Sequence, residues 1–158
     1  MSADKTDKRK RKRRSISMDY HYLQNSLYQN AAMGITALKQ VIPAVKDSGM
    51  KKILLGQYHG YQTQTELTSA QMRARGMTPE EPSASTKLMA RMSAAMKLRQ
   101  DSSSENIAKM LIKGTNTGII ELTGKLNKTN SDFPEAVTAA KEYLRREQKY
   151  IESLKPYL

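Results

Sequence analysis

The 158-residue chain contains no cysteine and no tryptophan, and it has only one phenylalanine and two histidines. The lack of cysteine excludes disulfides, thiolate zinc sites and thiol nucleophiles. No apolar run approaches the roughly 18 residues that a membrane-spanning helix needs. Polar residues from Asp19 onward interrupt the apolar stretch that a secretory signal would require. We therefore expect a cytoplasmic protein.

Acidic residues are scarce relative to basic ones. There are 15 Asp and Glu against 27 Lys and Arg, and the formal net charge is +12. Residues 1–18 hold eight of the cations and two of the acids, which is half of that excess. Most of it lies in one uninterrupted run: Lys8, Arg9, Lys10, Arg11, Lys12, Arg13 and Arg14. Because like charges repel and this run has no apolar surface to bury, we expect residues 1–18 to form a disordered basic arm.

Residues 19–158 have the pattern of a helical domain. They lack the strict alternation of apolar and polar residues that is typical of a half-buried strand, and apolar residues recur every three or four positions instead. The predicted helical segments are 20–46, 50–75, 85–99, 107–126 and 133–154. The segment 85–99 is either a short extra helix or the first half of the next one. The pattern predicts an all-α, antiparallel four-helix bundle with one proline-containing crossover.

Three methionines of segment 85–99, at positions 89, 92 and 96, have helical spacing. We expect Met89, Met92 and Met96 to pack in the core or in a groove for a partner, because methionine adapts well to irregular apolar spaces. Soft-metal binding is the alternative.

The second predicted helix is unusually polar. It carries Gln57, His59, Gln62, Gln64 and Gln71 beside Tyr58 and Tyr61. These side chains form either a hydrogen-bonded layer inside the bundle, with Asn30 and residues 115–117 as candidate partners, or a solvated face. A buried amide without a partner would cost roughly 1–3 kcal/mol.

Three segments carry a resemblance to a known family: Tyr22-Leu23-Gln24-Asn25, Met110-Leu111-Ile112-Lys113-Gly114-Thr115-Asn116-Thr117-Gly118-Ile119 and Glu147-Gln148-Lys149-Tyr150-Ile151. With the predicted long helices and crossover, residues 19–158 resemble the small ferritin-like bundles of Firmicutes bacteria, which lack an assigned function. A basic extension on such a body is also similar to the DNA-binding proteins from starved cells. The resemblance implies a ferritin-like fold and DNA binding by the arm.

The usual cofactor of that superfamily does not fit this sequence. A ferritin-type di-iron centre takes one Glu from each of two helices and a Glu-x-x-His pair from each of the other two. Neither His21 nor His59 has a glutamate three residues earlier, and after Glu147 the histidine position holds Tyr150. We therefore expect no metal site and no cofactor.

The sequence contains no nucleophile elbow, phosphate-binding loop or paired-carboxylate motif, so we expect a protein that is not an enzyme. Residues Lys8 to Arg14 are predicted to bind the backbone of DNA or RNA without sequence preference. An anionic membrane surface is the competing ligand, and a merely solubilising tail is the simplest alternative. A different hypothesis is a structural or protein-interaction module, oligomeric or spore-associated, with no role in nucleic-acid binding.

Overall fold

A computed structural model describes the backbone of residues 2–129 and 132–158, and the side chains of these residues except 2–4 and 15–18. The described part of the chain is all helical, as predicted, with five α-helices, two 3-10 turns and no strand. The elements are α1 (Ser2–Val41), η1 (Ile42–Ala44), α2 (Ser48–Arg73), α3 (Ala84–Gln100), α4 (Ser104–Lys128), α5 (Pro134–Leu154) and η2 (Lys155–Tyr157).

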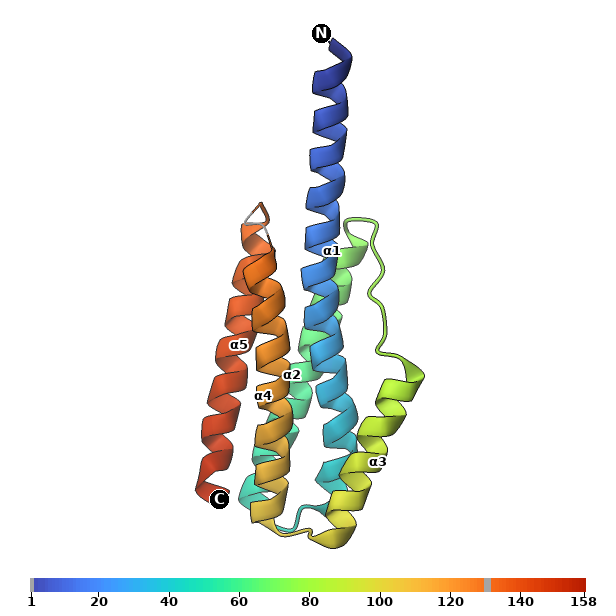
Figure 1. Cartoon of the computed structure of the whole chain (residues 1–158). Coiled ribbons are helices and arrows are strands. Elements are labelled where there is room, and N and C mark those ends of the chain that lie inside the picture. Colours follow the sequence, from blue (N-terminus) through green and yellow to red (C-terminus); the bar gives the residue numbers. More distant parts are fainter. Residues whose placement is uncertain (1, 130–131) are drawn as a thin grey trace.

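The helix α1 is the central element of the fold. It packs against α2, α3, α4 and α5, and α5 also packs against α2 and α4. Successive helices run in alternating directions, and the N-terminal part of α1 extends well beyond the other elements (Figure 1). A helix of 40 residues is about 60 Å long, which is more than the neighbouring helices can cover.

The prediction of a disordered arm requires correction, because the structure has residues 5–14 in the helix α1. Lys and Arg are good helix formers, and extending a helix already held by residues 20–41 avoids the cost of nucleating a new one. Asp7 and Arg11, four residues apart, form an ion pair of 3.1 Å that supports the same conformation. Residue 1 of the predicted arm and the side chains of residues 2–4 and 15–18 lie outside the described part.

The core lies where the apolar stripes of α1, α2, α4 and α5 meet. The apolar residues that recur every three or four positions in segment 20–46 form a buried stripe on α1, as the helical pattern predicts: Tyr20, Leu23, Leu27, Ala31 and Leu38. Burying each large apolar side chain contributes about 1.5–3 kcal/mol. This stripe therefore anchors α1 among its four neighbours, while the exposed residues 5–14 contribute nothing to the core.

Local signals explain the helix boundaries. The Asp47 side chain accepts a hydrogen bond of 2.7 Å from the Met50 amide and so caps the start of α2. The helix ends before Gly76, whose φ of 71° is the left-handed conformation that glycine tolerates best. Segment 85–99 proves to be a separate helix, α3, which Ser83 caps by accepting from the Thr86 amide at 3.1 Å.

Most of the large apolar residues of α3 face outward, although Leu98 packs against the core. Met89, Met92 and Met96 are exposed, so the expectation that they pack in the core is wrong, while packing in a groove for a partner stays a prediction. Ala94 is the one buried residue of α3, and small side chains such as Ala90 face the rest of the molecule. Because the side chains that α3 directs towards α1 are small, they do not fill the space between the two helices.

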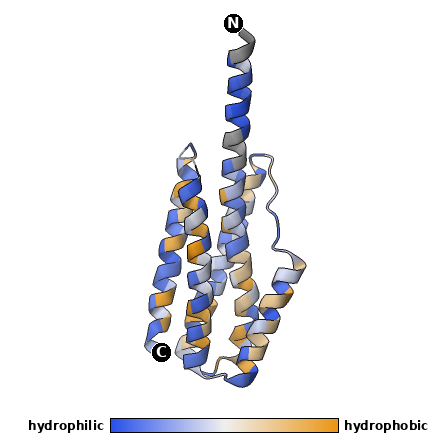
Figure 2. Cartoon of the chain, in the orientation of Figure 1, coloured by the Kyte–Doolittle hydropathy of each residue, from blue (hydrophilic) through white to orange (hydrophobic). Residues whose placement is uncertain are grey.

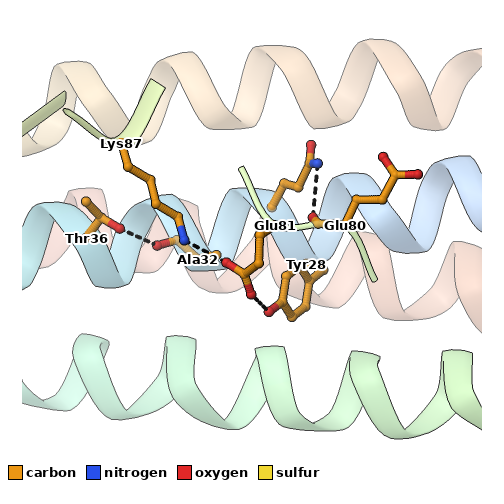
Figure 3. A network of polar contacts seen from close by, with 7 residues as sticks. Tyr28, Ala32, Thr36, Glu80, Glu81 and Lys87 are labelled. Carbon is orange, nitrogen blue, oxygen red and sulfur yellow. Dashed lines mark hydrogen bonds and ion pairs between the residues drawn. The ribbon is translucent and has the colours of Figure 1, made fainter. Parts of the chain in front are cut away.

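The crossover segment before α3 is tied to α1 by polar contacts (Figure 3). The Tyr28 hydroxyl donates to one carboxylate oxygen of Glu81, and Lys87 Nζ lies 2.7 Å from the other. Gln29 donates to the Glu80 carbonyl oxygen at 3.1 Å. These contacts hold the loop on α1 and thereby set the position from which α3 begins.

Candidate functional site

The predicted nucleic-acid-binding residues lie on the protruding part of α1. Lys8, Arg9, Lys10, Arg11, Lys12, Arg13 and Arg14 are all exposed. Successive residues of an α-helix are rotated by about 100° and rise by 1.5 Å, so seven consecutive cations surround the helix axis within about 10 Å of its length. Figure 2 shows this part of the helix as strongly hydrophilic. The structure therefore brings the cations together as a charged rod with no apolar face.

Arg11 of this rod already has an anionic partner. Arg11 Nε lies 3.1 Å from an Asp7 carboxylate oxygen, and both side chains are well exposed. An exposed ion pair of this kind contributes only about 0.3–0.5 kcal/mol, so a phosphate can displace Asp7 at little cost. The pair stabilises the helix and leaves the Arg11 side chain accessible to a phosphate.

A second polar centre lies inside the body, around Glu147 of α5. This side chain is 2% exposed. Gln57 donates to its Oε1 at 2.6 Å, and the Tyr61 hydroxyl donates to its Oε2 at 2.8 Å. Both donors come from α2, so the carboxylate links two helices across the core.

Burial dominates the electrostatics of this centre. It raises the pKa of Glu147 from an ordinary 4.5 to about 7, although the hydrogen bonds from Tyr61 and Gln57 and the charge of Arg146 act in the opposite direction. Burial, followed by the charge of Glu147, also raises the pKa of Tyr150. Among the described side chains, Glu147 is the one buried carboxyl. Its pKa of about 7 means that it changes its charge near neutral pH.

Further polar contacts extend this centre towards α1. The Tyr143 hydroxyl donates to Asn30 Oδ1 at 2.8 Å, and Asn30 Nδ2 donates to the Gly118 carbonyl oxygen at 2.9 Å. The side chain of Gln64 is also buried, donates to Thr68 and accepts from Arg146. These contacts form a hydrogen-bonded layer that includes residues of α1, α2, α4 and α5.

A cavity of about 590 Å³ lies beside this layer. Its walls come mainly from α1, α3 and α4, and Tyr61, Glu147 and Tyr150 reach it from α2 and α5. The Tyr150 side chain is 5% exposed, and its hydroxyl makes no hydrogen bond to any described group. The cavity therefore combines apolar walls with an ionisable group and an unpaired hydroxyl.

The sequence singled out the residues of this centre only in part. The polar side chains of the second predicted helix are partly inside and partly solvated: Gln64 is buried, Gln57 is half-buried and His59 is exposed. Of the suggested partners only Asn30 belongs to the layer, and it pairs with Tyr143 and Gly118 rather than with the α2 amides. In the sequence, Glu147 stands out only as part of an incomplete metal motif. The spacing of three or four between Gln57, Tyr61 and Gln64 was the available signal of an inward polar face.

Within the described part of the chain, no group of three or more His, Asp or Glu side chains is arranged to hold a metal ion. No helix among the same residues is long and apolar enough to cross a membrane. No protein-family model, curated protein or solved structure matches this chain.

Proposed function

We propose that the protein is a non-enzymatic helical module that binds the phosphate backbone of nucleic acid through residues Lys8 to Arg14. The observation that carries the proposal is the exposed rod of seven consecutive cations, which extends beyond the rest of the molecule (Figures 1 and 2). A neutral partner gains no charge neutralisation from this surface, and a basic partner is repelled by it. Phosphates at close spacing offer charge neutralisation together with the release of condensed counterions.

The helical shape of the rod favours duplex DNA over duplex RNA. The major groove of B-form DNA is about 12 Å wide and admits an α-helix, whereas the A-form major groove is too narrow for side chains to read. Residues 5–14 contain no aromatic side chain to stack on bases, so the binding is expected to ignore sequence.

An anionic membrane is a weaker fit. Helices that lie in a membrane interface combine a cationic face with an apolar one. Residues 5–14 of α1 consist of charged side chains and Thr6, so this part of the helix has no apolar face to insert. Adsorption to vesicles would then rest on charge alone.

The test is the affinity of the full chain for a random-sequence DNA duplex across a salt series, followed by fluorescence anisotropy. We expect the logarithm of the binding constant to fall with the logarithm of salt concentration, with a slope approaching about −6 if all seven cations meet phosphates. Replacing residues 8–14 with glutamine, a good helix former, should remove most of this slope.

A matched control separates the rod from net charge. It replaces seven exposed cations of the body with glutamine: Lys46, Lys51, Lys52, Lys128, Lys141, Arg145 and Lys149. Both variants lose the same charge, and we expect only the rod variant to lose binding. Equal losses in the two variants, a flat salt response, or tighter binding to anionic vesicles than to DNA would each refute the proposal.

We also propose that α1, α2, α4 and α5 form an antiparallel four-helix bundle of the ferritin-like type, with α3 inserted in its crossover. The packing of α1 and α5 against both α2 and α4, in alternating directions, supports this arrangement. An experimental structure in which α3 replaces one of these four helices in the core would contradict it.

A protein-interaction module is the second candidate function. The observation in its favour is the exposed apolar face of α3, formed by Leu88, Met89, Met92 and Met96. Light scattering on the full chain and on a variant with Met89 and Met92 replaced by glutamine tests it. A stable assembly that the variant loses, without any DNA affinity, would favour this function over the first.

A further inference from the structure

The cavity beside Glu147 exists because of the side chains that α3 presents to it. Ala90, Ser93 and Ala94 line it from α3, whereas Leu88 and the three methionines of that helix are exposed to solvent. The opposite walls include Leu38 of α1 and Leu111 of α4. Its volume of about 590 Å³ is within the range of roughly 300–1,000 Å³ typical of small-molecule sites.

The charge of Glu147 has no cationic partner in direct contact. Its oxygens accept from the neutral donors Gln57 and Tyr61, and none of the ion pairs between described side chains involves it. Arg146, the nearest cationic influence, donates to Gln64 instead. Each carboxylate oxygen has two acceptor positions, so about half of the acceptor capacity of Glu147 remains open.

The Tyr150 hydroxyl, one turn further along α5, is the second unsatisfied group. It is buried and makes no hydrogen bond to any described residue. Buried polar groups in proteins are almost always paired, and the Tyr150 side chain lines the cavity, so a partner for this hydroxyl would come from the cavity.

We propose that this cavity binds a small primary amine with an apolar body, its ammonium group lying between the Glu147 carboxylate and the Tyr150 hydroxyl oxygen. An ammonium has three donors and no acceptor, which matches the open acceptor positions of both side chains. The apolar body contacts the Leu38 and Leu111 walls. The proposal is independent of the nucleic-acid rod, which lies on a different part of α1.

Other ligand classes fit less well. A carboxylate ligand would bring a second negative charge beside Glu147, and a neutral alcohol would leave that charge unpaired in a buried place. The lysines that line the cavity, Lys97, Lys113 and Lys125, are exposed or half-exposed. Because these lysines are in contact with solvent, water screens their charges, and they favour an anion less than the buried Glu147 favours a cation.

The test is isothermal titration of the full chain at about pH 8 with n-hexylamine, n-hexanol and hexanoate, which share one apolar body and differ in the head group. We expect hexylamine to bind more tightly than the other two. Glu147→Gln should weaken hexylamine at least tenfold, and Tyr150→Phe should weaken it several-fold. Glu121→Gln, which removes an exposed carboxylate that also lines the cavity, is the matched control and should stay within about twofold of wild type.

Several results would overturn the proposal. They are no binding of hexylamine by the wild type, equal binding by wild type and Tyr150→Phe, or preference for hexanoate. Nuclear Overhauser contacts between the methyl groups of Met89 or Met92 and the Tyr150 ring would also overturn it, because α3 itself would then fill the cavity. Tyr150→Phe keeps the test decisive if the Glu147 variant does not fold, since it removes only one oxygen.

Discussion

The Tyr61 hydroxyl of α2 donates to Glu147 Oε2 of α5 at 2.8 Å, which places a carboxylate in the core of a strongly basic protein. Gly34 of α1 allows the Tyr61 ring to lie close to the α1 backbone, because glycine has no Cβ. A Cβ at position 34 would lie 2.6 Å from Tyr61 Cζ, well inside the distance at which atoms repel. Three helices thus combine to define one polar contact.

Replacing Glu147 with glutamine should change how stability depends on pH. The pKa of this carboxyl is about 7 in the folded protein against an ordinary 4.5. Between these values the folded state holds a proton that the unfolded state has released, so the unfolding free energy falls as pH rises from about 4.5 to 7. The total loss is about 3 kcal/mol. The unfolding free energy of Glu147→Gln relative to that of wild type should therefore rise by about 2–3 kcal/mol from about pH 5 to pH 8, as measured by urea unfolding at the two pH values.

Glu142→Gln, on an exposed position of the same helix, is the control for this experiment and should follow wild type at both pH values. A Glu147→Gln variant whose stability relative to wild type does not change with pH would show that the carboxyl is solvated.

Gly34→Ala should destabilise the protein although alanine is the better helix former. The new methyl group would displace the Tyr61 ring, and overpacking of this kind costs typically 1–3 kcal/mol, more than the roughly 1 kcal/mol gained in helix propensity. Gly60→Ala on α2 is the matched control, because nothing lies within 4 Å of its added Cβ, and it should stabilise by up to about 1 kcal/mol. Thermal unfolding of the two variants should give shifts of opposite sign. Stabilisation by both would contradict the close contact.

Asp7→Asn should strengthen binding to DNA. It removes the anion that pairs with Arg11. The slope of the logarithm of the binding constant against the logarithm of salt concentration should therefore become more negative by up to about one, and the affinity should rise a few-fold at low salt. Glu105→Gln makes the same change in net charge at another exposed i, i+4 pair, with Lys109, and serves as the control. An equal effect of the two variants would mean that only the overall charge matters.

Glu81→Ala should loosen α3 while leaving the core intact. The substitution removes the contacts with Tyr28 and Lys87 that tie the crossover to α1. Because these contacts are largely exposed, we expect a global loss below about 1 kcal/mol but faster amide hydrogen exchange across residues 84–100. Glu152→Ala, which removes an exposed ion pair with Lys155, should leave exchange in α3 unchanged. Unaltered exchange in the Glu81 variant would show that α3 is held by its own packing.

The sequence predicted the helical class and the stripe of α1 correctly because both depend on local periodicity. Leu23, Leu27 and Leu38 repeat at helical spacing, and the same side of α1 is buried. The same reasoning failed for Met89 and Met92, since an apolar face predicts burial only where a neighbouring element covers it. It also failed for residues 5–14, because repulsion between the cations does not outweigh the continuity of a long helix.

By itself, the sequence determined that the protein is helical, that it has no thiol chemistry, and that its charge is concentrated before residue 15. Only the tertiary structure decided that Glu147 is buried, that Gln57 and Tyr61 donate to it, and that the Tyr150 hydroxyl makes no hydrogen bond to any described residue. The reason is that helix formation depends on residues three and four positions apart. Desolvation of a carboxylate depends on which other helices surround it, and those helices come from distant parts of the chain.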